Sequence, residues 1–397
     1  MPMIYNRAII AIPAGVRFAF QRQGISRPGQ RCYGMISQKG KAMNTPTPTI
    51  APKHTLIPWG ALAALAMAMP VEAQRLKYQN DGVEVWARLA LSSQVAMLNT
   101  DMTTRDNGSW RSDASLRLNA QWISKDALTY GLRIEYDSDT HAAEELQRDE
   151  IYAYFVSDFG RVEIGEQDGP ADRLAFHAPI TGLGQIRGDF SRYVGRQALL
   201  SAYDTGDAAK LIYLSPPTRG WRFGASYAPE QTKNLDAERA RDRTQQRNAI
   251  EIGAQYQQDL GDWVGGVSGG YVAASAAPLT ERADINSWSI GGELRRGRFT
   301  FGTAYVWRGD SNLRAQNYNQ KETNVGISWR DKKWRAALSI SRTTSSSRNY
   351  NLLGIGFSMK LKPWINWRSD LVRYDESTPG NGAQQATVLL TELELRI

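Results

Sequence analysis

The sequence predicts an all-β protein, a transmembrane barrel of sixteen antiparallel strands with one long loop folded into its lumen. Three observations lead to this fold class. Apolar and polar residues alternate along many short segments, which is the pattern of strands with one apolar and one polar face. Tight turns alternate with longer polar connections throughout this region. Tryptophans recur beside the tight turns, where the strands of a membrane barrel meet lipid headgroups.

The alternating segments are regular enough to be placed one by one. In the first segment Val83, Val85 and Leu89 share one face, while Glu84 and Arg88 share the other. A soluble sandwich alternates too, but its connections do not divide so consistently into short and long sets. The sixteen strands are expected at residues 83–91, 114–122, 128–136, 149–157, 161–167, 210–215, 221–228, 249–257, 263–273, 287–295, 299–307, 323–329, 334–340, 353–359, 365–374 and 387–397.

Five tryptophans give an independent reason to place this barrel in a membrane. Each lies on the apolar face of its strand, within a few residues of a predicted short turn. An aromatic girdle at the membrane interface requires this placement, whereas aromatic residues of a soluble core do not need to gather at strand ends. The five residues are Trp122, Trp221, Trp263, Trp329 and Trp334.

The interval from Asp168 to about Gly206 breaks the alternation. It is far longer than an ordinary connection, and loops of this length are usually functional or disordered. Its apolar side chains need burial, and a loop pointing outwards would expose them together, so we expect the loop to fold into the barrel. These side chains are Leu174, Phe176, Ile180, Leu183, Ile186 and Phe190.

The stretch that leads into this loop, EIYAYFVSDFGRVEIGEQDGPADRL at residues 150–174, resembles a known family. It is similar to the fourth and fifth strands and the third loop of Gram-negative general porins, most closely the alphaproteobacterial kind. The rhythm of strands and turns from about Asp81 to the C-terminus extends the resemblance. It implies a trimer of 16-stranded barrels in which the third loop narrows each pore. Ile397 departs from the terminal aromatic residue, most often Phe, that such barrels usually carry.

Charged residues on the polar faces suggest where a pore would be narrowest. Three arginines lie on the lumen side of the first three strands, each about six or seven residues from the short-turn end, so we expect them at one height. The long loop supplies acids, and facing rings of opposite charge would filter solutes by size and charge. In the alternative interpretation the arginines pair with lumen acids such as Glu84 and Glu135 and hold the wall together. The predicted constriction residues are Arg88, Arg117, Arg133, Glu166, Asp168, Asp172 and Asp189.

The composition gives little support to catalysis or metal binding. The chain has 3 histidines, His54, His141 and His177, and the first lies in an expected leader. A histidine-based triad or metal site is therefore difficult to assemble. We expect no enzyme activity, no cofactor and no metal.

The N-terminal region is expected to be removed before the barrel assembles. Within residues 43–73, Lys53 and His54 precede an apolar core that is too short to span a membrane, and small residues precede Gln74, as in a secretory signal peptide. We interpret residues 1–42 as a non-native upstream extension and 74–397 as the porin barrel.

Loss of this leader changes the charge of the protein. Of the 48 basic and 40 acidic residues, eight basic and one acidic lie before Gln74, which leaves 40 and 39. The formal net charge of +8 therefore falls to about +1, so a nucleic-acid partner loses its main support. The sole cysteine, Cys32, also lies before Gln74, which fits a mature chain in an oxidising envelope compartment.

These inferences and the resemblance together predict an outer-membrane porin, a water-filled channel for the passive diffusion of ions and small hydrophilic solutes. The expected partners are two further copies in a homotrimer, outer-membrane lipid and lipopolysaccharide. Two alternatives remain open at this point: a channel specific for a sugar or an anion, and a soluble or surface-bound β protein that binds ligands. The charges do not decide between anion and cation preference.

The leader generates the first testable prediction. N-terminal sequencing of the protein extracted from outer membranes should begin at Gln74, because the small residues before it form the cleavage site. A mature N-terminus well upstream of Gln74 would contradict the proposed leader.

Overall fold

The computed structural model describes residues 76–101, 108–126, 128–138, 147–203, 205–230, 246–276, 282–313, 318–378 and 382–397. The expected extension at 1–42 and signal peptide at 43–73 lie outside the described residues, as do His54 and His141. Strands make up most of the described chain. None of the described helices is long and apolar enough to cross a membrane.

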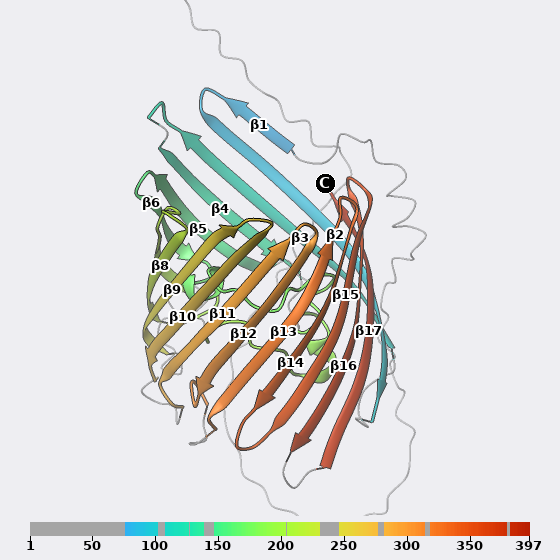
Figure 1. Cartoon of the computed structure of the whole chain (residues 1–397). Helices are drawn as coiled ribbons and strands as arrows, with labels where there is room; N and C mark the ends of the chain where they lie inside the picture. Colours follow the sequence, from blue (N-terminus) through green and yellow to red (C-terminus); the bar gives the residue numbers. More distant parts are fainter. Residues whose placement is uncertain are drawn as a thin grey trace, which may run out of the picture. The chain divides into compact units, whose positions relative to one another are not determined.

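Sixteen strands, β2 to β17, form an antiparallel sheet that closes on itself, as predicted (Figure 1). Each strand pairs with the next one along the chain, and β17 returns to pair with β2. Closure leaves no open sheet edge in the lipid. The strands are β2 (Val83–Thr100), β3 (Gly108–Ile123), β4 (Thr129–Asp137), β5 (Gln147–Ser157), β6 (Gly160–Glu166), β7 (Ala209–Leu214), β8 (Trp221–Glu230), β9 (Arg247–Leu260), β10 (Trp263–Ser275), β11 (Ile285–Arg296), β12 (Phe299–Gly309), β13 (Gln320–Arg330), β14 (Trp334–Thr344), β15 (Asn349–Lys362), β16 (Ile365–Thr378) and β17 (Gly382–Arg396).

A short additional strand, β1 (Leu76–Asn80), completes the closing seam and was not predicted. It pairs with residues 83–87 of β2, and β17 pairs with residues 90–100 on the same edge. Between them, the backbone N–H of Ile397 donates to the oxygen of Leu89 at 2.7 Å, and the reverse bond is 2.9 Å. Strand β1 has no clear alternation in its sequence, LKYQN, so only its partner reveals it.

Most strands extend further towards the long connections than the alternation indicated. Strand β2 continues to Thr100, β3 begins at Gly108 and β15 begins at Asn349. Beyond the hydrocarbon both faces of a strand can meet water, so backbone pairing continues where the apolar face no longer needs to. The periodicity therefore located the membrane-spanning part of each strand and missed its polar extension.

The exposure of the side chains is reversed relative to a soluble protein. Outward-facing Ile164, Ile290 and Val267 are 62%, 57% and 55% exposed. Inward-facing Glu163 and Glu251 are 1% and 0% exposed. A band of exposed apolar side chains around a polar interior is what a barrel in hydrocarbon requires.

Aromatic contacts mark the short-turn end of the barrel, where the sequence places a girdle. Trp122 stacks on Tyr130 with ring centroids 5.6 Å apart, and both rings are exposed. Trp221 stacks on Phe223 at 5.5 Å. These rings lie on the outward face beside short turns, as the girdle predicts.

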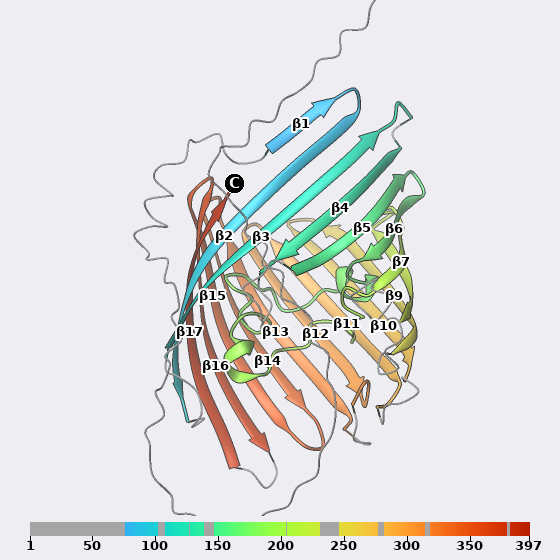
Figure 2. The ribbon, with the colours of Figure 1, turned by 180° about the vertical axis from the view of Figure 1, so that it is seen from behind.

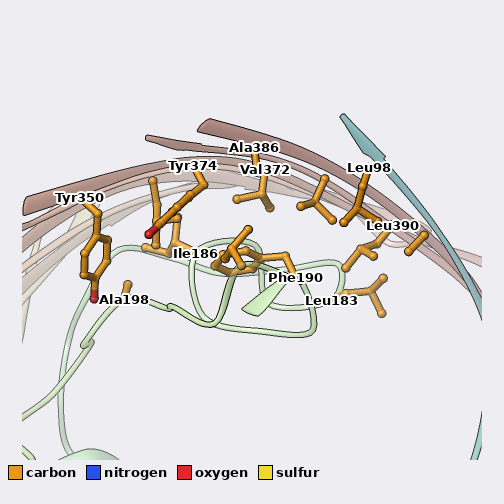
Figure 3. Close-up of a cluster of buried hydrophobic side chains, with 14 of the residues drawn as sticks. Leu98, Leu183, Ile186, Phe190, Ala198, Tyr350, Val372, Tyr374, Ala386 and Leu390 are labelled. Carbon is orange, nitrogen blue, oxygen red and sulfur yellow. The ribbon is translucent and has the colours of Figure 1, made fainter. Parts of the chain in front are cut away.

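The long loop between β6 and β7 lies inside the barrel (Figures 1 and 2). It contains two single-turn helices, α2 (Pro170–Arg173) and α3 (Ser191–Val194). Leu183, Ile186 and Phe190 pack on the inner wall formed by β15, β16 and β17 (Figure 3). Full burial of such side chains contributes about 1.5–3 kcal/mol each, so this packing holds the loop inside.

One of the six apolar loop residues departs from the expectation. Ile180 is 39% exposed, whereas Leu174, Phe176, Leu183, Ile186 and Phe190 are 8% exposed or less. The neighbouring Pro179 explains the difference, because its carbonyl accepts a hydrogen bond from Ser339 of the wall at 2.6 Å. The backbone is therefore attached at this point and the side chain of Ile180 is left facing water.

The two faces of the sheet generate the second prediction. Ile290→Arg, on the outward face at the middle of β11, should destabilise the assembled barrel by about 2–4 kcal/mol because it places a charge in hydrocarbon. Gln255→Arg, on the inward face of β9, is the control and should change stability little. Unfolding in urea from lipid vesicles measures both; equal effects would show that the two faces are assigned wrongly.

Candidate functional site

The constriction loop, residues 167–208, is attached to the wall by buried polar side chains. Asp370 on β16 accepts hydrogen bonds from the backbone N–H groups of Leu183 at 3.0 Å and Gln185 at 2.6 Å. Gln185 itself is fully buried and donates to Ser339 on β14 at 3.1 Å. An unpaired buried carboxylate is costly, so Asp370 and the loop amides stabilise one another.

A second anchor lies on β13. The amide oxygen of Asn324 accepts a hydrogen bond from the N–H of Ala178 at 2.8 Å, and its Nδ2 donates to the carbonyl of Leu199 at 3.2 Å. Asn324 is fully buried and so joins the outgoing and returning halves of the loop. The backbone N–H of Phe176 also donates a hydrogen bond to the hydroxyl oxygen of Ser268 on β10 at 2.7 Å.

The two ends of the loop meet at Glu251 on β9. This buried carboxylate accepts a bond from the N–H of Thr205 at 3.0 Å and pairs with the buried Lys210 at 3.3 Å. A Cβ at Gly169 would lie 1.7 Å from Glu251 Oε2, so glycine lets the outgoing end lie directly against this carboxylate. Glu251 therefore fixes where the loop leaves and rejoins the wall.

Two adjoining cavities lie beside the anchored loop. The first, of about 240 Å³, is lined by β2, β3, β4, β5 and β17. The second, of about 320 Å³, lies between Gly182–Gly184 and Asp189 of the loop and the strands β2, β3, β4, β16 and β17. Residues Ala90, Ser115, Asp137 and Glu394 line both cavities, so they are continuous. This is the water-accessible space beside the loop.

Two of the three predicted arginines line this space, and Arg133 lines neither cavity. Arg88 and Arg117 are direct cross-strand neighbours and both line the first cavity. Arg133 pairs in register with Asn119, and Arg117 pairs with Glu135. The pair that contains Arg133 lies one inward-facing position closer to the short turns. The three therefore occupy two adjacent heights of the wall instead of one.

Arg117 on β3 and Arg133 on β4 bind the same carboxylate. Arg117 and Arg133 each form an ion pair with Glu135, the partner that the wall-holding interpretation names. Two guanidinium groups on one carboxylate retain a net positive charge. The contacts therefore reinforce the wall and keep two guanidinium groups at the lumen surface, so the two interpretations of these arginines are compatible.

The predicted acids are more scattered. Asp189 lines the second cavity, where it accepts a bond from Gln94 on β2 at 2.6 Å and lies 3.8 Å from Arg192. Glu166 is buried in the wall, and both of its oxygens bind Arg148 at 2.9 and 3.0 Å.

Asp172 and Asp168 lie near the beginning of the loop. Asp172 accepts a bond from Ser201 and lies 3.5 Å from Arg187, so it pairs within the loop itself. Glu150, Asp168 and Asp207 can bring one oxygen each within 4.8 Å of one another, and they are the residues of the described chain that could hold a metal ion.

The carboxyl group of Asp168 has a raised pKa. Burial raises its pKa to about 6, and the nearby Asp207 and Asp172 act in the same direction. Lys210 and Arg187 oppose the shift. Asp168 therefore changes charge within the pH range in which a channel can be studied.

Residues at the other end of the chain complete the lining and were not predicted. Arg396 and Glu394 on β17 line the first cavity, and Arg368 on β16 lines the second. Arg368 binds Glu392 through Nε at 2.9 Å. The alternating polar residues of the last strand are visible in the sequence, but the position of Arg396 beside Arg88 follows only from closure between β17 and β2.

Comparison with known proteins relates this architecture to a family. The model of the Gram-negative porin family matches residues 60–378. No curated protein matches the chain.

Several solved outer-membrane proteins share the fold. The anion-selective porin from Comamonas acidovorans is 13% identical, with a TM-score of 0.56, and covers 79% of this chain and 100% of its own. The trimer form of OmpT of Vibrio cholerae is 14% identical, with a TM-score of 0.57 and coverage of 80% and 100%. The outer membrane channel DcaP of Acinetobacter baumannii is 11% identical, with a TM-score of 0.56 and coverage of 80% and 99%.

The raised pKa of Asp168 gives the third prediction. Above pH about 6 the carboxyl group is charged and below it the group is neutral. The cation preference of the wild type should therefore exceed that of Asp168→Asn at pH 8, and the two should converge at pH 5. Reversal potentials under a salt gradient measure this difference. Equal selectivity at both pH values would place Asp168 away from the ion path.

Proposed function

The chain belongs to the Gram-negative porin family, and on this premise we propose that the constriction loop and the wall of β2–β4 form the charge filter of a general diffusion channel. The protein is a passive channel of the outer membrane rather than an enzyme. The observation that carries the proposal is the continuous space between Asp189 of the loop and Arg88 and Arg117 of the wall.

A filter of this kind acts on charge and size. Arg88 and Arg117 bring positive charges to the wall side of this space, and Asp189 brings a negative charge from the loop side. Separated charges of opposite sign across a narrow aqueous opening create a transverse field. Such a field orients and sorts small polar solutes without a site shaped for one of them.

The surroundings of the channel follow from the same architecture. The exposed apolar band faces outer-membrane hydrocarbon, and the long connections would meet lipopolysaccharide. Assembly as a homotrimer is supported by the trimer form of the structurally similar V. cholerae protein. Export through the leader at residues 43–73 would deliver the chain to the membrane.

A channel specific for a sugar or an anion is the second candidate. The structurally similar C. acidovorans porin is anion-selective, and Arg88, Arg117 and Arg396 converge on one cavity here. The concentration dependence of conductance separates the candidates. A general channel conducts in proportion to salt concentration, whereas a specific one saturates or is blocked by its solute.

The filter generates the fourth prediction. Replacing Arg88, Arg117 and Arg133 together by Gln removes three positive charges and leaves Glu135 without its two ion pairs. The ratio of cation to anion permeability should rise severalfold in 0.1 M salt. The effect should shrink in 1 M salt, because the Debye length falls from about 10 Å to about 3 Å. Reversal potentials in planar bilayers measure the ratio.

Lysine at the same three positions is the matched control. Lys keeps each charge but loses the planar fork of Arg, so selectivity should stay near that of the wild type. If the Gln variant loses assembled barrels and whatever assembles keeps its selectivity, the arginines only hold the wall together.

A further inference from the structure

We propose that a further cavity, at β12 to β15 and separate from the filter, binds small hydroxylated organic anions such as sugar acids before they reach the constriction. This vestibule site lies between the returning part of the constriction loop and the long-connection ends of β12 to β15. Its volume is about 610 Å³, within the range of about 300–1,000 Å³ that is typical of small-molecule pockets. It goes beyond the proposed filter, which lies at β2–β4.

Arg308 is the central residue of the vestibule site. It points inward from the end of β12, and among the described residues no carboxylate lies within ion-pair distance of its guanidinium group. Its Nε is buried and has no hydrogen-bond partner in the described part of the chain. A buried cation without a counter-charge is unfavourable, and a bound anion would supply the missing partner.

The position of Arg308 is fixed by an aromatic platform. Its guanidinium group lies 4.2 Å from the ring centroid of Tyr203, a residue of the constriction loop. Tyr203 is held by two hydrogen bonds, from its N–H to Ser287 at 2.9 Å and from Asn312 Nδ2 to its hydroxyl group at 2.6 Å. Arg308 is therefore preorganised, and a ligand would not have to order it.

Two more arginines line the same cavity. Arg196 comes from the constriction loop and is half-buried, and it donates a hydrogen bond to the neighbouring carbonyl of Gly195 at 2.6 Å. Arg348 pairs with Glu376 at 2.9 Å. None of the residues lining this cavity in the described chain is acidic. The lining is thus net cationic, in contrast to the mixed charges beside the filter.

The remaining lining indicates an organic anion with hydroxyl groups. Gln197, Gln320 and Ser345 present amide and hydroxyl groups around the arginines. Tyr350 also lines the cavity, and its hydroxyl group donates a hydrogen bond to the carbonyl of Gln197 at 3.0 Å. Figure 3 shows Tyr350 extending from the wall towards the loop at Ala198. Arginine forks match carboxylates and phosphates, and the neutral donors and acceptors suit sugar hydroxyls.

The test uses the full-length channel in planar bilayers in about 0.1 M KCl, where screening is moderate. Potassium glucuronate is added to each side in turn, with glucose as the neutral probe. In the wild type, glucuronate should reduce the current saturably and glucose should not. Arg308→Gln should raise the half-blocking glucuronate concentration about tenfold, equivalent to about 1.4 kcal/mol.

Arg335→Gln is the matched control. Arg335 lies on β14 of the same wall, at the short-turn end, and faces inward by its register with buried Ala337 and Ser339. This variant should keep the wild-type half-blocking concentration. An equal rise in Arg308→Gln and Arg335→Gln would mean that the wall charge as a whole attracts glucuronate, and would overturn the site.

Three other results would also overturn the proposal: no saturable block of the wild type, equal block by glucose, or unchanged block in a correctly assembled Arg308→Gln channel. If Arg308→Gln does not assemble, Arg196→Gln in the loop serves instead, and an unchanged half-blocking concentration rejects the site. The filter is tested by ion selectivity without glucuronate. A failure of the vestibule site therefore leaves that test unaffected.

Discussion

The need to pair every backbone N–H and C=O group inside hydrocarbon is the constraint on which the rest of this structure depends. It forces the sheet to close, so β17 returns to β2, and the mutual bonds of Leu89 and Ile397 continue the pairing to the last residue. β1 then covers the part of the β2 edge that β17 does not reach. These are backbone bonds, which any residue at position 397 could make. Closure also places the polar face of every strand on the inside, where buried charges must find partners.

The constriction loop supplies many of those partners. Asp370 accepts hydrogen bonds from the backbone N–H groups of Leu183 and Gln185 of the loop. Glu251, which already pairs with Lys210 of β7, accepts one from that of Thr205. In return, these acids and the apolar cluster around Phe190 hold the loop against β9–β17. Gln94 on β2 and Ser109 on β3 also form hydrogen bonds with the loop, to Asp189 and Tyr193. The water-accessible space lies beside these contacts, at the closing seam.

The chemistry of the lumen divides between two walls. At the seam, arginines and carboxylates alternate and share partners, as Arg117 and Arg133 share Glu135, so the field is strong but the net charge is small. At β12–β15, Arg308 rests on Tyr203 and is not balanced in this way by a neighbouring acid of the described chain. A passing solute meets groups that sort by charge on one wall and groups that can hold an anion on the other.

The sequence by itself determined the strand order, the apolar face of each strand and the interior position of the long loop. These follow from local periodicity and from the burial that Phe190 and its neighbours require. Tertiary structure alone decided which charges meet. Strand β1, the stagger of Arg133 relative to Arg117, and burial of Glu166 against Arg148 depend on the register of consecutive strands. The position of Arg396 beside Arg88 and the contact of Arg308 with Tyr203 depend on partners far away in sequence. Periodicity assigns a side chain to a face of the sheet, but its neighbours across strands are set by long-range pairing.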